Sequence, residues 1–235
     1  MAQGMKVKYL RAEEIEASAL YLLAEYGRKF SLIQLPPVPV EEILECHIEL
    51  HLDFDDLSKR LGISDVLGAT WIQEKQVLID RSLDPTLHSS IEGRYRFTLA
   101  HELGHWELHR HLFQSNPGQG LLFNEAHPPA IVCRTSSRKE PIEWQADTFA
   151  GYLLMPKEMI LQAWKEHYWS LEPYIAAKEI AHVSAYGSLG EDKCPVVEIA
   201  RKLANEFLVS GQAMQIRLIN LGLIKTEAPA LGLFS

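Results

Sequence analysis

The sequence predicts an α+β fold in which a small antiparallel or mixed sheet packs on one long, buried helix. Apolar residues at helical spacing come before and after short apolar runs typical of strands, in the order helix, small sheet, helix. The chain has 235 residues, of which 47% are hydrophobic, so a substantial core can form. No apolar run reaches the roughly 18 residues that a membrane span requires.

The N-terminal part is expected to form one helix followed by a break. This helix spans residues 12–26 and stops at Gly27. Its apolar residues recur at helical spacing and are Ile15, Ala19, Leu22 and Tyr26. The run Pro36-Pro37-Val38-Pro39 then interrupts the chain, and a short helix is expected at residues 40–46.

The expected sheet begins after this short helix. Residues 48–52 alternate apolar and polar side chains, as in a half-buried strand. Residues 53–64 are polar and predict a loop or a short helical turn. Residues 67–72 and 76–80 then predict a hairpin, and we expect an extended peptide to be able to pair with its edge.

The helix expected at residues 94–112 carries the most informative motif. His101-Glu102-Leu103-Gly104-His105 is an H-E-x-x-H sequence. Residues i and i+4 are neighbours on a helix, so both imidazoles can approach one zinc ion at about 2.0–2.1 Å. Glu102 lies about 100° round the helix from His101 and can hold a water molecule instead.

The same helix is expected to be buried, because apolar side chains lie nearly all round it. They are Phe97, Leu99, Leu103, Trp106 and Leu108. Two histidines and a glutamate without partners would destabilise a buried helix, and a metal ion removes that cost. The alternative interpretation is a pair of core histidines with local hydrogen bonds.

Two connections flank this helix. Before it, Asp84-Pro85 is expected to open another helix, which Gly93 separates from the motif helix. After it, residues 113–141 are rich in loop-forming residues. A loop of this length inside a domain is either functional, such as a cover over a cleft, or a disordered insertion.

A hydrolytic zinc site takes three protein ligands and leaves one position open, so a third ligand is needed. His111 has the spacing of H-E-x-x-H-x-x-G-x-x-H, but Leu108 replaces the glycine that turns the chain back. Cys133 could reach the metal from the loop. His109 lies about 12 Å along the helix axis from His101, too far to share the ion.

A stronger candidate for the third ligand lies on the helix expected at residues 142–155, which Pro156 ends. Glu143 and Asp147 are i and i+4 on one face of this helix. Glu143 can then bind the zinc, while Asp147 accepts a hydrogen bond from the far nitrogen of a ligand histidine and fixes its tautomer. The alternative is a pair of solvated acids on an exposed face.

The C-terminal part is expected to be helical. Residues 166–191 predict a helix with a glycine-rich connection at 186–190. Helices expected at 196–207 and 211–221, with Ser210 as an N-cap, resemble a helix-turn-helix unit. We therefore expect two domains, a catalytic domain at 1–165 that includes the 113–141 insertion and a helical segment at 166–235.

This helix-turn-helix-like unit offers little support for DNA binding. Leu208 replaces the usual turn glycine, and only Arg217 and Lys225 are basic in and just after the second helix. The net charge of −8 points the same way. Direct contact with nucleic acid through residues 196–225 is the weaker interpretation, and a packing unit or a dock for a protein substrate is preferred.

The cysteines and the N-terminus favour the cytoplasm. The three cysteines are far apart and form no C-x-x-C pair, which suits a reducing compartment. They are Cys46, Cys133 and Cys194. The first residues lack the apolar segment of a signal peptide.

Two motifs resemble the ImmA/IrrE metallopeptidases. They are Phe-Thr-Leu-Ala-His-Glu-Leu-Gly-His at 97–105 and Glu-x-x-Ala-Asp-x-Phe-Ala-x-x-Leu-Leu-Met-Pro at 143–156. The Glu-x-x-x-Asp element is similar to the second motif of the thermolysin-like gluzincins. The resemblance covers roughly Pro36 to Ile224. At the position of Asp147 the family more often has asparagine, and the 113–141 insertion is long for the family.

The resemblance implies a minimal zincin-like core and a zinc endopeptidase. Zn²⁺ would be held by His101, His105 and Glu143, Glu102 would act as general base and then acid, and Asp147 would orient a ligand histidine. Its substrate would be a protein, such as a helix-turn-helix transcriptional repressor, which implies transcription regulation. The candidates for the oxyanion donor are Tyr152, His167, His182 and Tyr186.

Two other classes of function are kept as alternatives. One is a DNA-binding or protein-binding regulator with a structural zinc, which predicts a fourth protein ligand and no position for water. The other is an interaction protein with a vestigial metal site, which predicts no stoichiometric metal. Glu102 argues against both, because a structural site has no need of an acid at that position.

Overall fold

The computed structural model describes residues 7–87, 91–114, 131–134, 140–177, 179 and 196–226, with Gln114 and 131–134 described by their backbone alone. The chain divides into two compact units, Met1–Leu154 and Met155–Ser235. The predicted boundary after residue 165 falls inside a helix of the second unit, Lys157–Tyr168. The assignment of two domains stays a prediction. Within the described part, no helix is long and apolar enough to cross a membrane.

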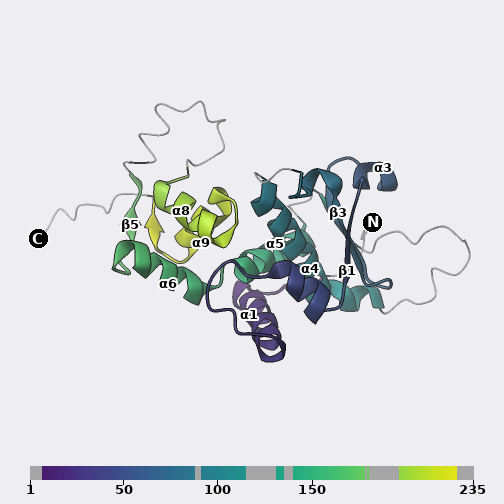
Figure 1. The fold of residues 1–235 in the computed structure, drawn as a ribbon, viewed down its shortest axis with the longest axis horizontal. Coiled ribbons are helices and arrows are strands. Elements are labelled where there is room, and N and C mark those ends of the chain that lie inside the picture. Colours follow the sequence, from purple (N-terminus) through teal and green to yellow (C-terminus); the bar gives the residue numbers. More distant parts are fainter. Residues whose placement is uncertain are drawn as a thin grey trace, which may run out of the picture. The chain divides into compact units, whose positions relative to one another are not determined.

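The first unit has the predicted α+β composition (Figure 1). Its helices are α1 (Ala12–Lys29), α2 (Val40–Glu42), α3 (Leu57–Leu61), α4 (Glu92–Gln114) and α5 (Pro141–Leu154). Its strands are β1 (His51–Asp55), β2 (Val66–Trp71), β3 (Gln76–Asp80) and β4 (Ile131–Arg134). A π-helical turn, Ile43–His47, follows α2, and a 3₁₀ turn, Arg81–Leu83, follows β3.

The strands form one mixed sheet in the order β1-β3-β2-β4. β2 and β3 pair antiparallel, which confirms the predicted hairpin, and β1 pairs parallel to β3. β4 pairs antiparallel to β2, so part of the segment expected to be a loop at 113–141 is a strand. Both edges of the hairpin are therefore covered, and the expectation that a peptide adds to the hairpin edge is wrong. The outer edges of this sheet belong to β1 and β4.

The first strand begins three residues later than predicted. The short helix continues as the π-helical turn, whose Ile43 carbonyl accepts a hydrogen bond from the Ile48 amide. Glu49 then adopts a left-handed conformation, with φ of 63°, and turns the chain into β1. Of the alternating residues 48–52, the first three therefore form a helix end and a turn, and residues 51 and 52 lie in the strand. In the region expected to be a loop or a short helical turn, β1 continues to Asp55, and the short helix α3 then follows, as the second alternative predicts.

No helix opens at Asp84 in the described residues. The Asp84 carboxylate accepts hydrogen bonds from both the amide and the hydroxyl of Thr86, at 2.9 and 2.6 Å, and this local turn competes with a helix. Gly93 also does not precede the motif helix but lies in the first turn of α4. Residues 88–90, where the expected helix would continue, lie outside the described residues.

The motif helix α4 contacts the sheet through β2, β3 and β4 and packs against α5 (Figure 1). Gly104 permits a close approach of these two helices. A Cβ atom there would lie 3.2 Å from both the Cα and the carbonyl oxygen of Ala146 on α5. α5 also packs on α1, whose buried residues are the predicted Ile15, Ala19, Leu22 and Tyr26.

The second unit contains α6 (Lys157–Tyr168), β5 (Tyr174–Ile175), α8 (Glu198–Phe207), α9 (Gly211–Asn220) and β6 (Ile224–Lys225). The predicted cap is present, because the Ser210 hydroxyl accepts a hydrogen bond from the Ala213 amide. Leu208 takes the left-handed conformation that glycine usually supplies at such turns, with φ of 50°. The glycine-rich connection expected at 186–190 lies outside the described residues.

The second helix of this pair presents an uncharged surface. Its exposed residues are Gln212, Ile216 and Asn220. Arg217 is buried, and its Nε donates to the Met155 carbonyl, so this charge serves packing. Gln215 is also buried and accepts from the Val197 amide at the start of α8. Among the described residues of α9, no basic side chain is exposed to grip a phosphate backbone.

Candidate metal centre

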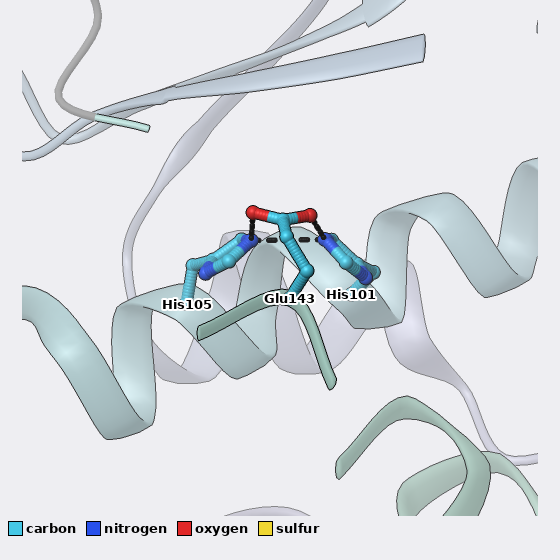
Figure 2. A group of neighbouring side chains, drawn as sticks. All are labelled: His101, His105 and Glu143. Carbon is cyan, nitrogen blue, oxygen red and sulfur yellow. Dashed lines mark hydrogen bonds and ion pairs between the residues drawn. The ribbon is translucent and has the colours of Figure 1, made fainter. Parts of the chain in front are cut away.

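The two motif histidines lie one turn apart on α4, and both are buried. Their Nε2 atoms point at one another and are 2.9 Å apart (Figure 2). This convergence follows from the i and i+4 spacing on a helix that the sheet and α5 enclose. Among the described residues, one group has the composition and spacing of a metal site: His101, His105 and Glu143, whose ligand atoms lie within 4.8 Å of one another.

Glu143 reaches the two histidines from the first turn of α5. Its carboxylate oxygens lie 3.3 Å from His101 Nε2 and 3.4 Å from His105 Nε2 (Figure 2). Burial alone would raise the pKa of Glu143, but its contacts with the two imidazoles outweigh burial and lower that pKa to about 2. The carboxylate is therefore charged at neutral pH, although it is buried.

Asp147 lies one turn further along α5. Its Oδ1 is 2.9 Å from His101 Nδ1. A carboxylate can only accept, so His101 Nδ1 carries a hydrogen. In the neutral imidazole the lone pair is then on Nε2, the atom that faces the site. Asp147 thus occupies the position that the sequence predicts, and its role in orienting a ligand stays a prediction.

These donors fit a metal ion. Burial, and after it the neighbouring His101, lowers the pKa of His105 to about 4, so His105 is neutral at physiological pH. His101 Nδ1 faces Asp147 and His105 Nδ1 faces His109. When each neutral ring donates from Nδ1, two lone pairs face one another across 2.9 Å, and a cation between them satisfies both. Two nitrogens and one carboxylate oxygen form a ligand set that zinc accepts.

Glu102 lies on the sheet side of α4 and is fully buried. The Thr70 hydroxyl on β2 donates to its Oε2 at 2.6 Å, and its Oε1 has no hydrogen-bond partner among the described residues. A Cβ atom at Gly68 would lie 2.5 Å from that Oε1. Burial raises the pKa of Glu102 to about 7, against the lowering effects of His101 and Thr70. A carboxylate with a pKa near neutrality suits proton transfer.

The raised pKa of Glu102 makes stability depend on pH. When folding raises the pKa of a group, its contribution to stability is fully present at pH values below its pKa in the unfolded state. This contribution is lost as the pH rises through its pKa in the folded state. For Glu102 the window runs from pH 4.5 to about 7. We expect the metal-free wild type to lose about 3 kcal/mol of unfolding free energy relative to Glu102→Gln across this window. Denaturant unfolding of both proteins at pH 4.5 and 8 measures it, and parallel pH profiles would contradict it.

Four polar or small residues near the centre were not predicted from the sequence. Thr70 and Gly68 contact Glu102 from β2, and His109 and Gln145 lie behind His105. One signal was available, since His109 lies four residues after His105 and is therefore its neighbour on α4. The contacts of the other three depend on how α4 packs against the sheet and α5.

Of the other candidate ligands, only His111 can be compared with this group, and it is not a member. His111 is exposed on α4. Cys133 lies in β4, where its backbone is the register partner of Gly68, and its side chain lies outside the described part.

The roles of the candidate oxyanion donors stay predictions. Tyr152 lies nine residues after Glu143, which is about 13 Å along α5. His167, in the second unit, pairs with Glu206. His182 and Tyr186 lie outside the described residues.

The fold and this centre define a metallopeptidase-type protein with a zincin-like core. The sequence profile of the IrrE N-terminal-like domain, a peptidase family, matches residues 52–218, and the chain belongs to this family. Among solved structures, a Mycobacterium tuberculosis transcriptional regulator is similar, with a TM-score of 0.48 and 14% identity. The match covers 89% of this chain and 47% of that one, so the chain spans about half the regulator's length. No curated protein matches the chain.

Proposed function

We propose that this chain is a zinc-dependent endopeptidase. The observation that carries the proposal is the fully buried Glu102, whose Oε1 has no partner among the described residues, next to three converging donors. A structural metal site has no use for such a base, whereas hydrolysis of a peptide bond requires one.

In this proposal, His101, His105 and Glu143 hold the metal, and Asp147 fixes the tautomer of His101. A zinc ion in this position supplies Lewis-acid chemistry to the scissile carbonyl and to water. Glu102 takes the proton of the attacking water at Oε1 and delivers it to the leaving amine. The Thr70 hydroxyl holds Oε2, at 2.6 Å, which leaves Oε1, without a partner among the described residues, available to take a proton.

Peptide cleavage by zinc-loaded protein tests the proposal. A diverse peptide library is incubated with wild type and with Glu102→Gln, and new amino termini are identified by mass spectrometry. We expect zinc-dependent cleavage with wild type only, while both proteins hold the same amount of zinc. Equal cleavage by both proteins would contradict the role of Glu102. If wild type cleaves neither the library nor the repressors named below, the proposal of an endopeptidase is wrong.

The protein substrate that we propose is a helix-turn-helix transcriptional repressor, which places the reaction in the cytoplasm. The support is the resemblance of the two motifs to the ImmA/IrrE metallopeptidases. Repressors of this class from the same genome are incubated with zinc-loaded wild type, and Glu102→Gln serves as a trap that binds without cutting. Cleavage of one repressor at a single bond is expected. Cleavage of unrelated proteins at equal rates would contradict a dedicated target.

A further inference from the structure

A continuous chain of hydrogen bonds extends from His105 away from the metal centre. His105 Nδ1 lies 3.1 Å from His109 Nδ1, and His109 Nε2 lies 3.0 Å from Gln145 Oε1. The Gln145 amide nitrogen donates to the Lys8 carbonyl at 2.9 Å. The side chains of His109 and Gln145 are both buried, with 1% and 0% of their surface exposed. Three elements thus contribute: α4, α5 and the segment before α1.

The direction of every hydrogen bond in this chain follows from its last member. The Lys8 carbonyl can only accept, so it fixes the Gln145 amide with nitrogen towards Lys8 and oxygen towards His109. That oxygen also only accepts, so His109 carries its hydrogen on Nε2. The lone pair of a neutral His109 is then on Nδ1, and His105 must donate to it from its own Nδ1.

This leaves the lone pair of His105 on Nε2, the atom that faces His101 and Glu143. We propose that His109 and Gln145, anchored by the Lys8 carbonyl, are positioning residues that hold His105 in the tautomer and orientation required for metal binding. This inference rests on the proposed metal site. It gives a role to a histidine that is too far along the helix from His101 to be a ligand.

The two motif histidines therefore have hydrogen-bond partners of different kinds. His101 donates to a carboxylate, that of Asp147, whose side chain is 33% exposed. His105 donates into an uncharged chain whose two side chains, His109 and Gln145, are buried. Partners of this kind typically change metal affinity by roughly 10- to 100-fold when they are removed.

The tautomers themselves test the proposal without any measurement of activity. Long-range ¹H–¹⁵N NMR spectra of the full-length protein, assigned with single histidine variants, report which ring nitrogen carries the hydrogen. We expect His109 to carry it on Nε2 and His105 on Nδ1, in both the metal-free and the zinc-loaded protein. A hydrogen on Nδ1 of His109, or zinc bound through Nδ1 of His105, would overturn the proposal.

Zinc affinity, measured by competition with a chromophoric chelator, gives the second readout. His109→Phe keeps most of the ring volume but accepts no hydrogen bond, and a loss of roughly 10- to 100-fold is expected. His109→Asn retains an acceptor near the Nδ1 position and should recover most of the affinity. Gln145→Leu should fall between wild type and His109→Phe. His111→Phe, an exposed change on the same helix, is the matched control.

The outcomes separate a positioning role from packing and from the proposed function. If His109→Phe and His109→Asn lose equal affinity, or neither loses any, the positioning role is wrong. The unfolding free energy of each metal-free variant shows how much of any change comes from stability alone. If wild type binds no zinc, the proposed function fails, while the tautomers of the metal-free protein still decide whether the hydrogen-bond chain has the inferred direction.

Discussion

Glu143→Ala is expected to lower zinc affinity by two to three orders of magnitude and to leave the purified protein without stoichiometric metal. Structural zinc sites with four protein ligands contribute about 10–16 kcal/mol, or roughly 3–4 kcal/mol per ligand. Each 1.4 kcal/mol is a tenfold change in affinity. Glu143 supplies the only carboxylate of the group formed by the described residues, and its oxygens lie 3.3 and 3.4 Å from the two imidazoles. Elemental analysis and chelator competition measure the loss.

Two substitutions serve as controls for this result. Glu140→Ala removes an exposed acid just before the same helix, and we expect it to leave the zinc content unchanged. His111→Ala removes the alternative ligand suggested by the extended motif spacing. If His111→Ala loses the metal and Glu143→Ala retains it, the proposed ligand set is wrong. If wild type binds no zinc under zinc-replete conditions, the endopeptidase proposal fails as well.

The parts of this fold that the sequence predicts are those that local periodicity determines. The buried residues of α1 are the four apolar residues at helical spacing, and the hairpin of β2 and β3 follows two apolar runs around a short turn. His101 and His105 converge because of their i and i+4 spacing on α4, whereas the approach of Glu143 from α5 also depends on how these two helices pack. Spacing along one element is visible in a single sequence.

The parts that were missed depend on contacts between elements. β4 is a strand because it pairs with β2, and its four residues lie in a segment dominated by loop-forming residues. The alternation at 48–52 has the period of a strand, but the hydrogen bond from Ile48 to Ile43 continues the preceding helix instead. His109 was judged by its distance from His101, although its nearer neighbour on the helix is His105.

Gly68 shows how the sheet determines the position of the proposed base. It pairs with Ile79 of β3 and Cys133 of β4, so its backbone position is fixed from both sides. Its missing side chain leaves the space that Glu102 fills, with Oε1, Cδ and Cγ of that residue 2.5–3.0 Å from an added Cβ. Thr70, two residues along the same strand, holds the other carboxylate oxygen. β2 therefore positions Glu102 by both contact and hydrogen bonding.

Gly68→Ala is accordingly expected to abolish most hydrolysis while zinc stays bound. The added methyl group must displace the Glu102 side chain, since the contact includes Cγ as well as the carboxylate. General acid–base catalysis contributes about 10²–10⁴-fold, so cleavage should fall by at least about 100-fold. The zinc content should match wild type, because the three atoms nearest to the added methyl group all belong to Glu102 and none belongs to a proposed ligand. Cleavage rates and zinc content of the two proteins measure the effect.

A double-mutant cycle on the metal-free protein tests the same contact without a substrate. Overpacking of this kind costs about 1–3 kcal/mol, so Gly68→Ala should lower the unfolding free energy by that amount in the wild-type background. In the Glu102→Ala background the clashing atoms are gone, and the same change should be neutral or stabilising. The resulting coupling between the two positions is the quantity that denaturant unfolding yields. Equal destabilisation in both backgrounds would show that Gly68 is required for the strand itself, and that the close approach of β2 does not position Glu102.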